Sequence, residues 1–149
     1  MYDQIHSMRA RIVSSPSFNS KNIIGAILFE MTMNKQINGK ASATYLWEDL
    51  GIVPFLKIDS GLEPEENGVH LLKNIYEIDK KLEIAVSKGI FGTKMRSVIN
   101  SASEKGINEV VEQQFKISEQ INKYNLVPII EPEITISIAD KENAEKILM

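Results

Sequence analysis

The sequence predicts an α/β fold: a parallel sheet of the TIM-type (β/α) barrel class, present in part, as about four of the eight βα units. Four apolar runs alternate with helical patterns along the 149 residues. This alternation is typical of parallel sheets whose strands are covered by helices. Three of the four runs end in charged residues. Barrels of this class keep their chemistry at the C-terminal ends of the strands, so both observations favour the same architecture.

The expected strands lie at regular intervals in the chain. They are Ile23–Phe29, Ile52–Ile58, Gly89–Lys94 and Val127–Ile130. Regular spacing is expected for right-handed crossovers between parallel strands. A doubly wound sheet would suit the length, but no Gly-rich phosphate-binding turn follows the first strand. A complete barrel needs about 250 residues, so we interpret the chain as a segment from the middle of a barrel.

Helical patterns precede, separate and follow these strands. They are Tyr2–Val13, Ala41–Leu50, Ile75–Ser87, Glu104–Tyr124 and a last helix that begins at an Asp140 cap and runs to Met149. Gly51 and Gly89 close two of the helices as stop signals. The length favours a single domain, so residues 1–149 are expected to form one partial (β/α) barrel domain.

The composition excludes several classes of protein. Hydrophobic residues make up 43% of the chain and charged residues 25%, which is the balance of a globular protein rather than a disordered one. The net charge of −3 gives no sequence-independent affinity for nucleic acid. The absence of cysteine excludes disulfides and a thiol nucleophile and favours the cytoplasm. We expect no signal peptide and no membrane span.

Charged residues stand at the ends of three consecutive strands. They are Lys57 and Asp59, then Lys94 and Arg96, then Glu131 and Glu133. Neighbouring parallel strands would bring these side chains to one edge of the sheet. A carboxylate beside ammonium groups stays ionised more easily, and a lysine beside other cations loses its proton more easily. This combination suits carbonyl chemistry through an imine, in which protons are shuttled and anionic phosphates are held.

Three further expectations concern single residues. Asp59 could orient Lys57 or cap the segment that follows, and the sequence favours neither. Pro132 keeps Glu131 extended, and we expect regular strand pairing to end there. Glu30 is expected to be an exposed acid at the end of the first strand.

The two histidines and the tryptophan have ordinary interpretations. His6 and His70 are isolated from each other and from any set of acids at metal-ligand spacing, so we expect surface histidines and no metal site. Trp47 falls within a helical pattern, where it is expected to be a packing residue.

Five segments carry a resemblance to a known family. Lys57-Ile-Asp-Ser-Gly61, Gly92-Thr-Lys-Met-Arg96 and Val127-Pro-Ile-Ile-Glu-Pro-Glu-Ile134 resemble motifs of the class I fructose-bisphosphate aldolases, in the form found in certain bacteria. Ile27-Leu-Phe29 and Met8-Arg-Ala-Arg11 are similar to the second strand of that family and the helix before it. The resemblance runs from about Tyr2 to the end of the chain.

The resemblance implies an activity and a set of roles. Enzymes of this family are (β/α)₈ barrels that cleave fructose 1,6-bisphosphate reversibly to dihydroxyacetone phosphate and glyceraldehyde 3-phosphate in glycolysis, through a Schiff base and without a metal or other cofactor. Glu131 would be the acid/base of Schiff-base formation, and Glu133 would position the lysines beside it. Lys94 and Arg96 would hold phosphate and stabilise charge, and Lys57 would bind substrate. The catalytic candidates are thus Glu131 and Lys94, and the substrate-binding candidates are Lys57, Asp59, Arg96 and Glu133.

The chain also departs from the family pattern. No residue matches the first strand with its Asp, the sixth strand with the imine-forming Lys, or the later Gly-rich loop and Arg that bind the other phosphate. Ser60 stands where a Lys is usual.

Three hypotheses follow. The first is a truncated or split part of a class I aldolase, inactive alone. The second is a non-catalytic half-barrel that binds or oligomerises, and the third is a half-barrel lyase or isomerase for another phosphorylated sugar. The expected partners are a phosphorylated sugar and either a second copy or a complementary barrel fragment, with no nucleic acid and no membrane.

Overall fold

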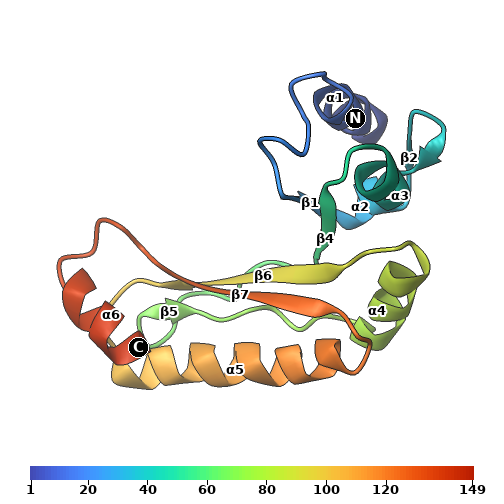
Figure 1. Ribbon diagram of the computed structural model, residues 1–149. Helices are drawn as coiled ribbons and strands as arrows, with labels where there is room; N and C mark the ends of the chain where they lie inside the picture. Colours follow the sequence, from blue (N-terminus) through green and yellow to red (C-terminus); the bar gives the residue numbers. More distant parts are fainter.

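A computed structural model describes residues 1–149 and contains a main sheet in which four strands run parallel (Figure 1). These strands, in spatial order, are β1 (Gly25–Leu28), β4 (Val53–Lys57), β6 (Gly92–Ile99) and β7 (Val127–Ile134). A fifth, short strand, β5 (Val69–His70), pairs antiparallel with β6. The predicted α/β class with a parallel sheet is therefore confirmed, with one antiparallel strand that the sequence analysis did not anticipate.

Helices pack against one face of the sheet and around its β1 edge. They are α1 (Tyr2–Val13), α2 (Glu30–Met33), α3 (Ser42–Thr44) with its π-helical continuation η1 (Tyr45–Asp49), α4 (Ile78–Ser87), α5 (Glu104–Asn122) and α6 (Lys141–Leu148). Helix α5 runs beneath β6 and β7, while α1, α2 and α3 gather around β1 and β4 at the other end (Figure 1). No helix is both long enough and apolar enough to cross a membrane.

The hairpin of β2 (Gln36–Ile37) and β3 (Lys40–Ala41) was not predicted. Its turn is Asn38-Gly39, and both residues have positive φ, 51° and 79°. Two consecutive residues of positive φ favour Asn-Gly at a two-residue hairpin turn. The dipeptide is a recognised hairpin signal, so the sequence could have revealed this element.

Strand β7 corrects the expectation that pairing ends at Pro132. Its register with β6 continues through Ser97 beside Pro132 to Ile99 beside Ile134. The N–H groups of Val127 and Thr135 both point toward β6, where they donate to the carbonyls of Phe91 and Ile99. Alternation along a strand therefore turns the nitrogen of Pro132 to the free edge, where a missing N–H breaks no ladder bond.

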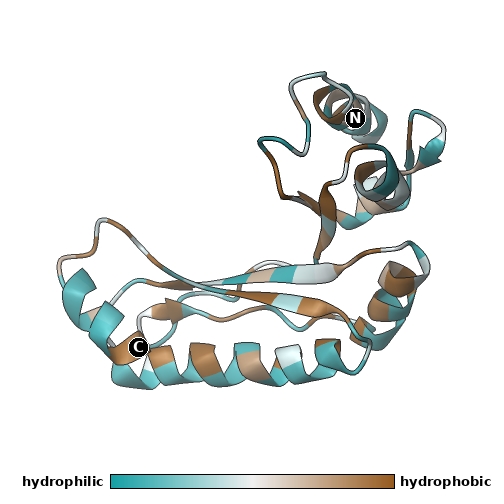
Figure 2. Cartoon of the chain, in the orientation of Figure 1, coloured by the Kyte–Doolittle hydropathy of each residue, from teal (hydrophilic) through white to brown (hydrophobic).

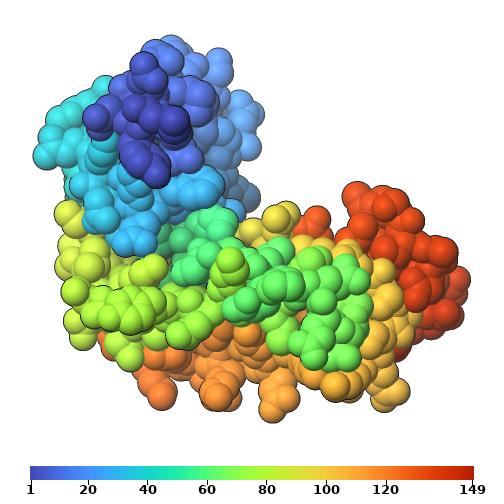
Figure 3. All heavy atoms as spheres, turned by 180° about the vertical axis from the view of Figure 1, so that it is seen from behind, coloured from blue at the N-terminus to red at the C-terminus, as the bar shows by residue number.

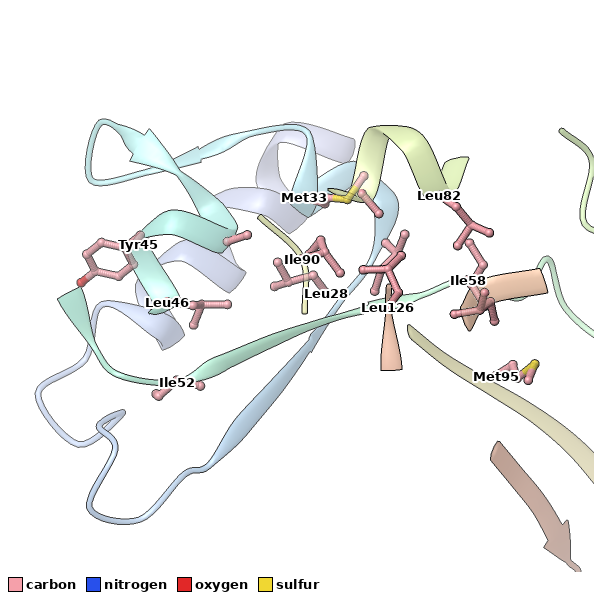
Figure 4. Close-up of a cluster of buried hydrophobic side chains, with 14 of the residues drawn as sticks. Leu28, Met33, Tyr45, Leu46, Ile52, Ile58, Leu82, Ile90, Met95 and Leu126 are labelled. Atoms are coloured by element: carbon pink, nitrogen blue, oxygen red, sulfur yellow. The ribbon is translucent and has the colours of Figure 1, made fainter. Parts of the chain in front are cut away.

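The larger hydrophobic core lies between the sheet and the helices α1, α2, α3, η1 and α4 (Figure 4). Leu46, Ile52 and Leu82 are fully buried there, and Leu28 and Leu56 come from the helix-facing side of β1 and β4. In Figure 2 both of these strands are coloured as hydrophobic. A smaller cluster around Val69, Ile99 and Val110 joins β5 and β6 to α5 and includes Ala144 of α6. The core therefore fixes the strands from one side only.

Helices α4 and α5 are joined by Asp79, which makes folding stability depend on pH. Its carboxylate accepts hydrogen bonds from Gln120 Nε2 at 2.9 Å and Tyr124 Oη at 3.0 Å. These bonds favour the ionised form and hold the pKa of Asp79 below its ordinary value of 3.8. The stabilisation is therefore present above the ordinary pKa, and it is lost as pH falls through the lowered pKa of the folded state.

We expect Asp79→Asn to flatten the acid side of the stability profile, because the substituted side chain has no proton to gain. Urea denaturation at a series of pH values from neutral down to about 2 measures this slope. Gln120→Leu removes one of the two hydrogen-bond donors to Asp79 and should flatten the acid side of the stability profile in part. An unchanged slope in both variants would contradict the assignment.

Candidate functional site

The charged residues share one face of the sheet. Only Lys57 stands at the end of its strand, because β6 and β7 continue past their charged residues, and the expectation that β6 ends at Lys94 is wrong. In register, Lys57 lies beside Lys94, and Lys94 lies beside Ile129, while Arg96 lies beside Glu131. Residues in parallel register point to the same face, and the alternate residues point to the other. Those alternate residues on β4 and β6 are buried. The charged residues therefore lie on the face that α5 does not cover (Figure 1), which we call the open face.

Two ion pairs cross from β6 to β7 on the open face. Lys94 Nζ lies 2.6 Å from Glu131 Oε2, and Arg96 NH1 lies 2.8 Å from Glu133 Oε2. Each pair is diagonal, since Glu131 is in register with Arg96 and not with Lys94. The Lys94 side chain is only 14% exposed, whereas that of Arg96 is 47% exposed. Arg96 is therefore the more accessible cation for a ligand from solvent.

The third ion pair lies within one strand end and its loop. Lys57 Nζ pairs with Asp59 Oδ1, and the same oxygen accepts a bond from the N–H of Gly61 at 3.3 Å. Both contacts that the sequence left open for Asp59, with Lys57 and with the segment that follows, are thus present together. The Asp59 side chain is 4% exposed, and its Oδ2 is buried without a hydrogen-bond partner. The three cations of the open face are matched by three carboxylates.

Below the charges, toward the N-terminal ends of the strands, the open face is apolar. Phe55 lies between Gly92, its register partner on β6, and Gly25, which lies diagonally from it on β1. A Cβ on Gly92 would come within 2.8 Å of the Phe55 ring, and one on Gly25 within 3.3 Å. The Phe55 ring also meets Phe91 edge to face at 5.7 Å, and Phe91 stacks on Trp47 at 6.2 Å. The absence of side chains on the two glycines is what lets Phe55 lie across the sheet.

Gln114 of α5 reaches the site from the opposite face, and the sequence analysis missed it. It is fully buried and bonds both the N–H and the carbonyl of Glu131. A signal was available, because Gln114 and Ser118 occupy the same helical stripe as the apolar Val110 and Ile121, at spacings of three and four residues. A polar side chain in such a stripe needs buried hydrogen-bond partners.

The remaining sequence-predicted residues lie outside this group. Glu30 is exposed as expected, 3.4 Å from Lys81. His6 and His70 are half-buried rather than fully at the surface, and each bonds a backbone carbonyl. Trp47 packs on Phe91 but remains 51% exposed. No group of three or more His, Asp or Glu side chains is placed to hold a metal ion.

An apolar groove of about 300 Å³ runs along the β1 edge of the sheet, apart from the charged residues. Ile12, Val13 and Phe18 line one side of it, and Ile27 lines the other. Arg9 lies at the groove with its guanidinium 4.2 Å from the centre of the Phe29 ring. The N-terminal residues stand up from one end of an elongated body, which leaves the molecule open on one side (Figure 3).

Comparisons with known proteins point to one family. A family model described as fructose-bisphosphate aldolase class-I matches residues 3–146. The class 1 fructose-bisphosphate aldolase of Clostridium acetobutylicum is 54% identical over 148 residues, which cover 99% of this chain and 50% of that protein. The chain thus spans about half the length of this curated relative.

A solved structure agrees in fold. The fructose-bisphosphate aldolase of Plasmodium falciparum, crystallised with TRAP and a small-molecule inhibitor, matches 76% of this chain and 35% of its own, with a TM-score of 0.64 and 25% identity. The match supports an α/β fold that is part of a TIM barrel. Together with the family model, which covers nearly every residue, it leads to one conclusion: the chain belongs to the class I fructose-bisphosphate aldolase family.

Proposed function

We propose that the chain supplies part of the active site of a class I fructose-bisphosphate aldolase, and that its open face binds the phosphorylated sugar. The observation that carries this proposal is the side-by-side placement of three cations and two carboxylates on one face of three neighbouring strands. A phosphate is a suitable ligand for such cations, because charge-assisted bonds from ammonium and guanidinium groups to phosphate oxygens are the strong ones. In this reading the reaction is reversible aldol cleavage through a Schiff base.

Each side chain has a role in that reading. Glu131 is the acid/base, because its carboxylate is within hydrogen-bond distance of an ammonium group, 2.6 Å from Lys94 Nζ, and such contact permits proton transfer. Arg96 holds phosphate with the N–H groups that Glu133 leaves unoccupied. Lys57 binds substrate, and Asp59 orients it. The proposed setting is the cytoplasm, and the proposed partners are a complementary barrel fragment or a second copy.

Binding of fructose 1,6-bisphosphate tests the anion site. We expect Arg96→Ala to weaken binding by roughly 1–3 kcal/mol, the cost of a hydrogen bond to a charged group. Isothermal titration at low salt measures the affinity. Lys105→Ala is the matched control: it removes an exposed cation of α5 that pairs with Glu109 at 3.9 Å, and it should leave affinity unchanged. Equal affinity of Arg96→Ala and the unmodified chain would remove Arg96 from the site.

Activity of the chain alone gives a second test. We expect no aldol cleavage, or very weak cleavage, because no residue matches the imine-forming lysine of the family. Lys57 and Lys94 are both engaged in ion pairs with carboxylates, those of Asp59 and Glu131. The measurement is cleavage of fructose 1,6-bisphosphate together with borohydride trapping. Borohydride-dependent labelling of Lys57 or Lys94 by dihydroxyacetone phosphate would contradict this expectation.

The alternative is a half-barrel that binds or oligomerises without catalysis. It is favoured by the apolar part of the open face, where Ile27 and Phe29 are 49% and 48% exposed. An experiment that adds the remaining half of the aldolase, taken from a relative, distinguishes the two functions. Restored cleavage supports the enzyme, and binding of phosphate without restored cleavage supports the module.

A further inference from the structure

Gln114 connects the covering helix to the peptide group of Glu131. Its Oε1 accepts a hydrogen bond from the N–H of Glu131 at 3.1 Å. Its Nε2 donates to the carbonyl of Glu131 at 3.2 Å and to Ser97 Oγ at 2.9 Å. Gln114 and Ser97 are both fully buried, so water does not compete for these bonds. The side-chain amide thus bonds both backbone polar groups of one residue on β7.

These hydrogen bonds affect a side chain on the opposite face of the sheet, that of Glu131. Gln114 holds the backbone of Glu131 from the helix-covered side, while the Glu131 side chain extends over the open face to Lys94 Nζ, 2.6 Å away. Pro132 restricts the same residue to extended conformations. A long carboxylate side chain keeps a fixed contact only where its backbone is fixed.

We propose that Gln114 is a positioning residue, which sets the place of the Glu131 carboxylate against Lys94. The catalytic meaning of this contact rests on the proposed function, but the positioning itself does not. Packing alone would favour an apolar residue here, because a buried amide is costly unless its hydrogen bonds are complete. The amide of Gln114 has three such bonds.

The neighbouring residue offers a matched control. Gln113 makes the same kind of two-bond contact with another backbone: its Oε1 accepts from the N–H of Leu72 at 2.8 Å, and its Nε2 donates to the carbonyl of Leu72 at 3.0 Å. Leu72 follows β5 and carries no charge. Gln113→Met and Gln114→Met therefore remove the same chemistry from adjacent positions of one helix, and only the second removes it from Glu131.

The test observes the ammonium group of Lys94 directly by ¹H–¹⁵N NMR of the 149-residue chain. In the unmodified protein we expect a resolved Lys94 ammonium signal, because the side chain is 14% exposed and held by a carboxylate. Gln114→Met should raise the hydrogen-exchange rate of the Lys94 ammonium group about tenfold, the effect of one lost hydrogen bond. Gln113→Met should leave this rate unchanged. Equal exchange rates in the two variants, whether unchanged or raised, would overturn the proposal.

A second measurement needs no variant, in case Gln114→Met does not fold. Both side-chain amide protons of Gln114 are bonded and buried, so they should exchange slowly in the unmodified protein. Fast exchange of this pair would overturn the proposal. Neither readout uses substrate, so the positioning role can stand if fructose 1,6-bisphosphate does not bind, and it can fail while binding and complementation succeed.

Discussion

In size-exclusion chromatography with light scattering, the 149-residue chain is expected to elute at micromolar concentration as a dimer or larger species, or to be unstable as a monomer. The main reason is the exposed edge of β1. Ile24 turns its carbonyl toward β4, where it accepts from Val53, so Gly25 and Ile27 turn their N–H and carbonyl groups to the free edge. No proline or charged residue interrupts this edge, and such edges promote association.

The apolar surface beside this edge adds to the effect. The groove of about 300 Å³ follows β1, and Ile27 and Phe29 of the open face are half-exposed. The other free edge, on β7, is less suited to pairing, since Pro128 and Pro132 remove two of its outward N–H donors.

A charge on β1 tests the site of association. Ile27→Lys should shift the chain toward monomer, because it places an ammonium group on the edge strand and the open face. Ile136→Lys is the control, since Ile136 is 85% exposed in the segment after β7 and should leave the association unchanged. A monomeric unmodified chain with a sharp melting transition at micromolar concentration would show that the edge argument is wrong.

Gly92→Ala is expected to be among the most destabilising single-methyl changes in the chain. A Cβ at Gly92 would lie 2.2 Å from the carbonyl oxygen of Val127 and 2.8 Å from the Phe55 ring. The carbonyl belongs to the paired strand β7 and cannot move without loosening the β6–β7 ladder, so the overlap is relieved by backbone shift. Such overpacking costs about 1–3 kcal/mol, and occasionally more.

Urea denaturation measures this cost, and Gly25→Ala provides the control. Gly25 lies on the other side of Phe55, on the edge strand β1, where the nearest atoms to a Cβ are 3.3 Å away. A smaller loss of unfolding free energy is expected there, within about 1 kcal/mol. Equal losses at the two glycines would mean that the close approach of β7 does not decide the effect.

The sequence predicted the order and the parallel direction of the four main strands, because apolar runs leave local patterns. The rule that an apolar run followed by a charge marks a strand end placed Lys57, Lys94 and Glu131 on neighbouring strands. Only β4 ends at its charge, however, and β6 continues past Lys94 to Ile99. The length of β7 was not predictable by the same rule. Whether Pro132 ends a strand depends on which edge its nitrogen faces, and that is set by pairing with a distant segment.

The contribution of α5 to the site was also hidden from local patterns. Gln114 follows Gln113 in sequence, and the two are chemically identical, yet one bonds Glu131 and the other bonds Leu72. Only the packing of the helix on β6 and β7 assigns them different partners. The diagonal pairing of Lys94 with Glu131 likewise depends on strand register, which the sequence does not specify.

The three ion pairs of the open face have a consequence for how a barrel can be divided. Every cation there has its carboxylate on the same polypeptide: Lys57 with Asp59, Lys94 with Glu131, and Arg96 with Glu133. Separating the members of a pair would leave its less exposed member, Asp59 or Lys94, without a counter-charge, which is unfavourable. This part of the barrel is electrostatically self-sufficient, so whatever covers its open face needs to supply apolar surface and strand pairing, but no counter-charge.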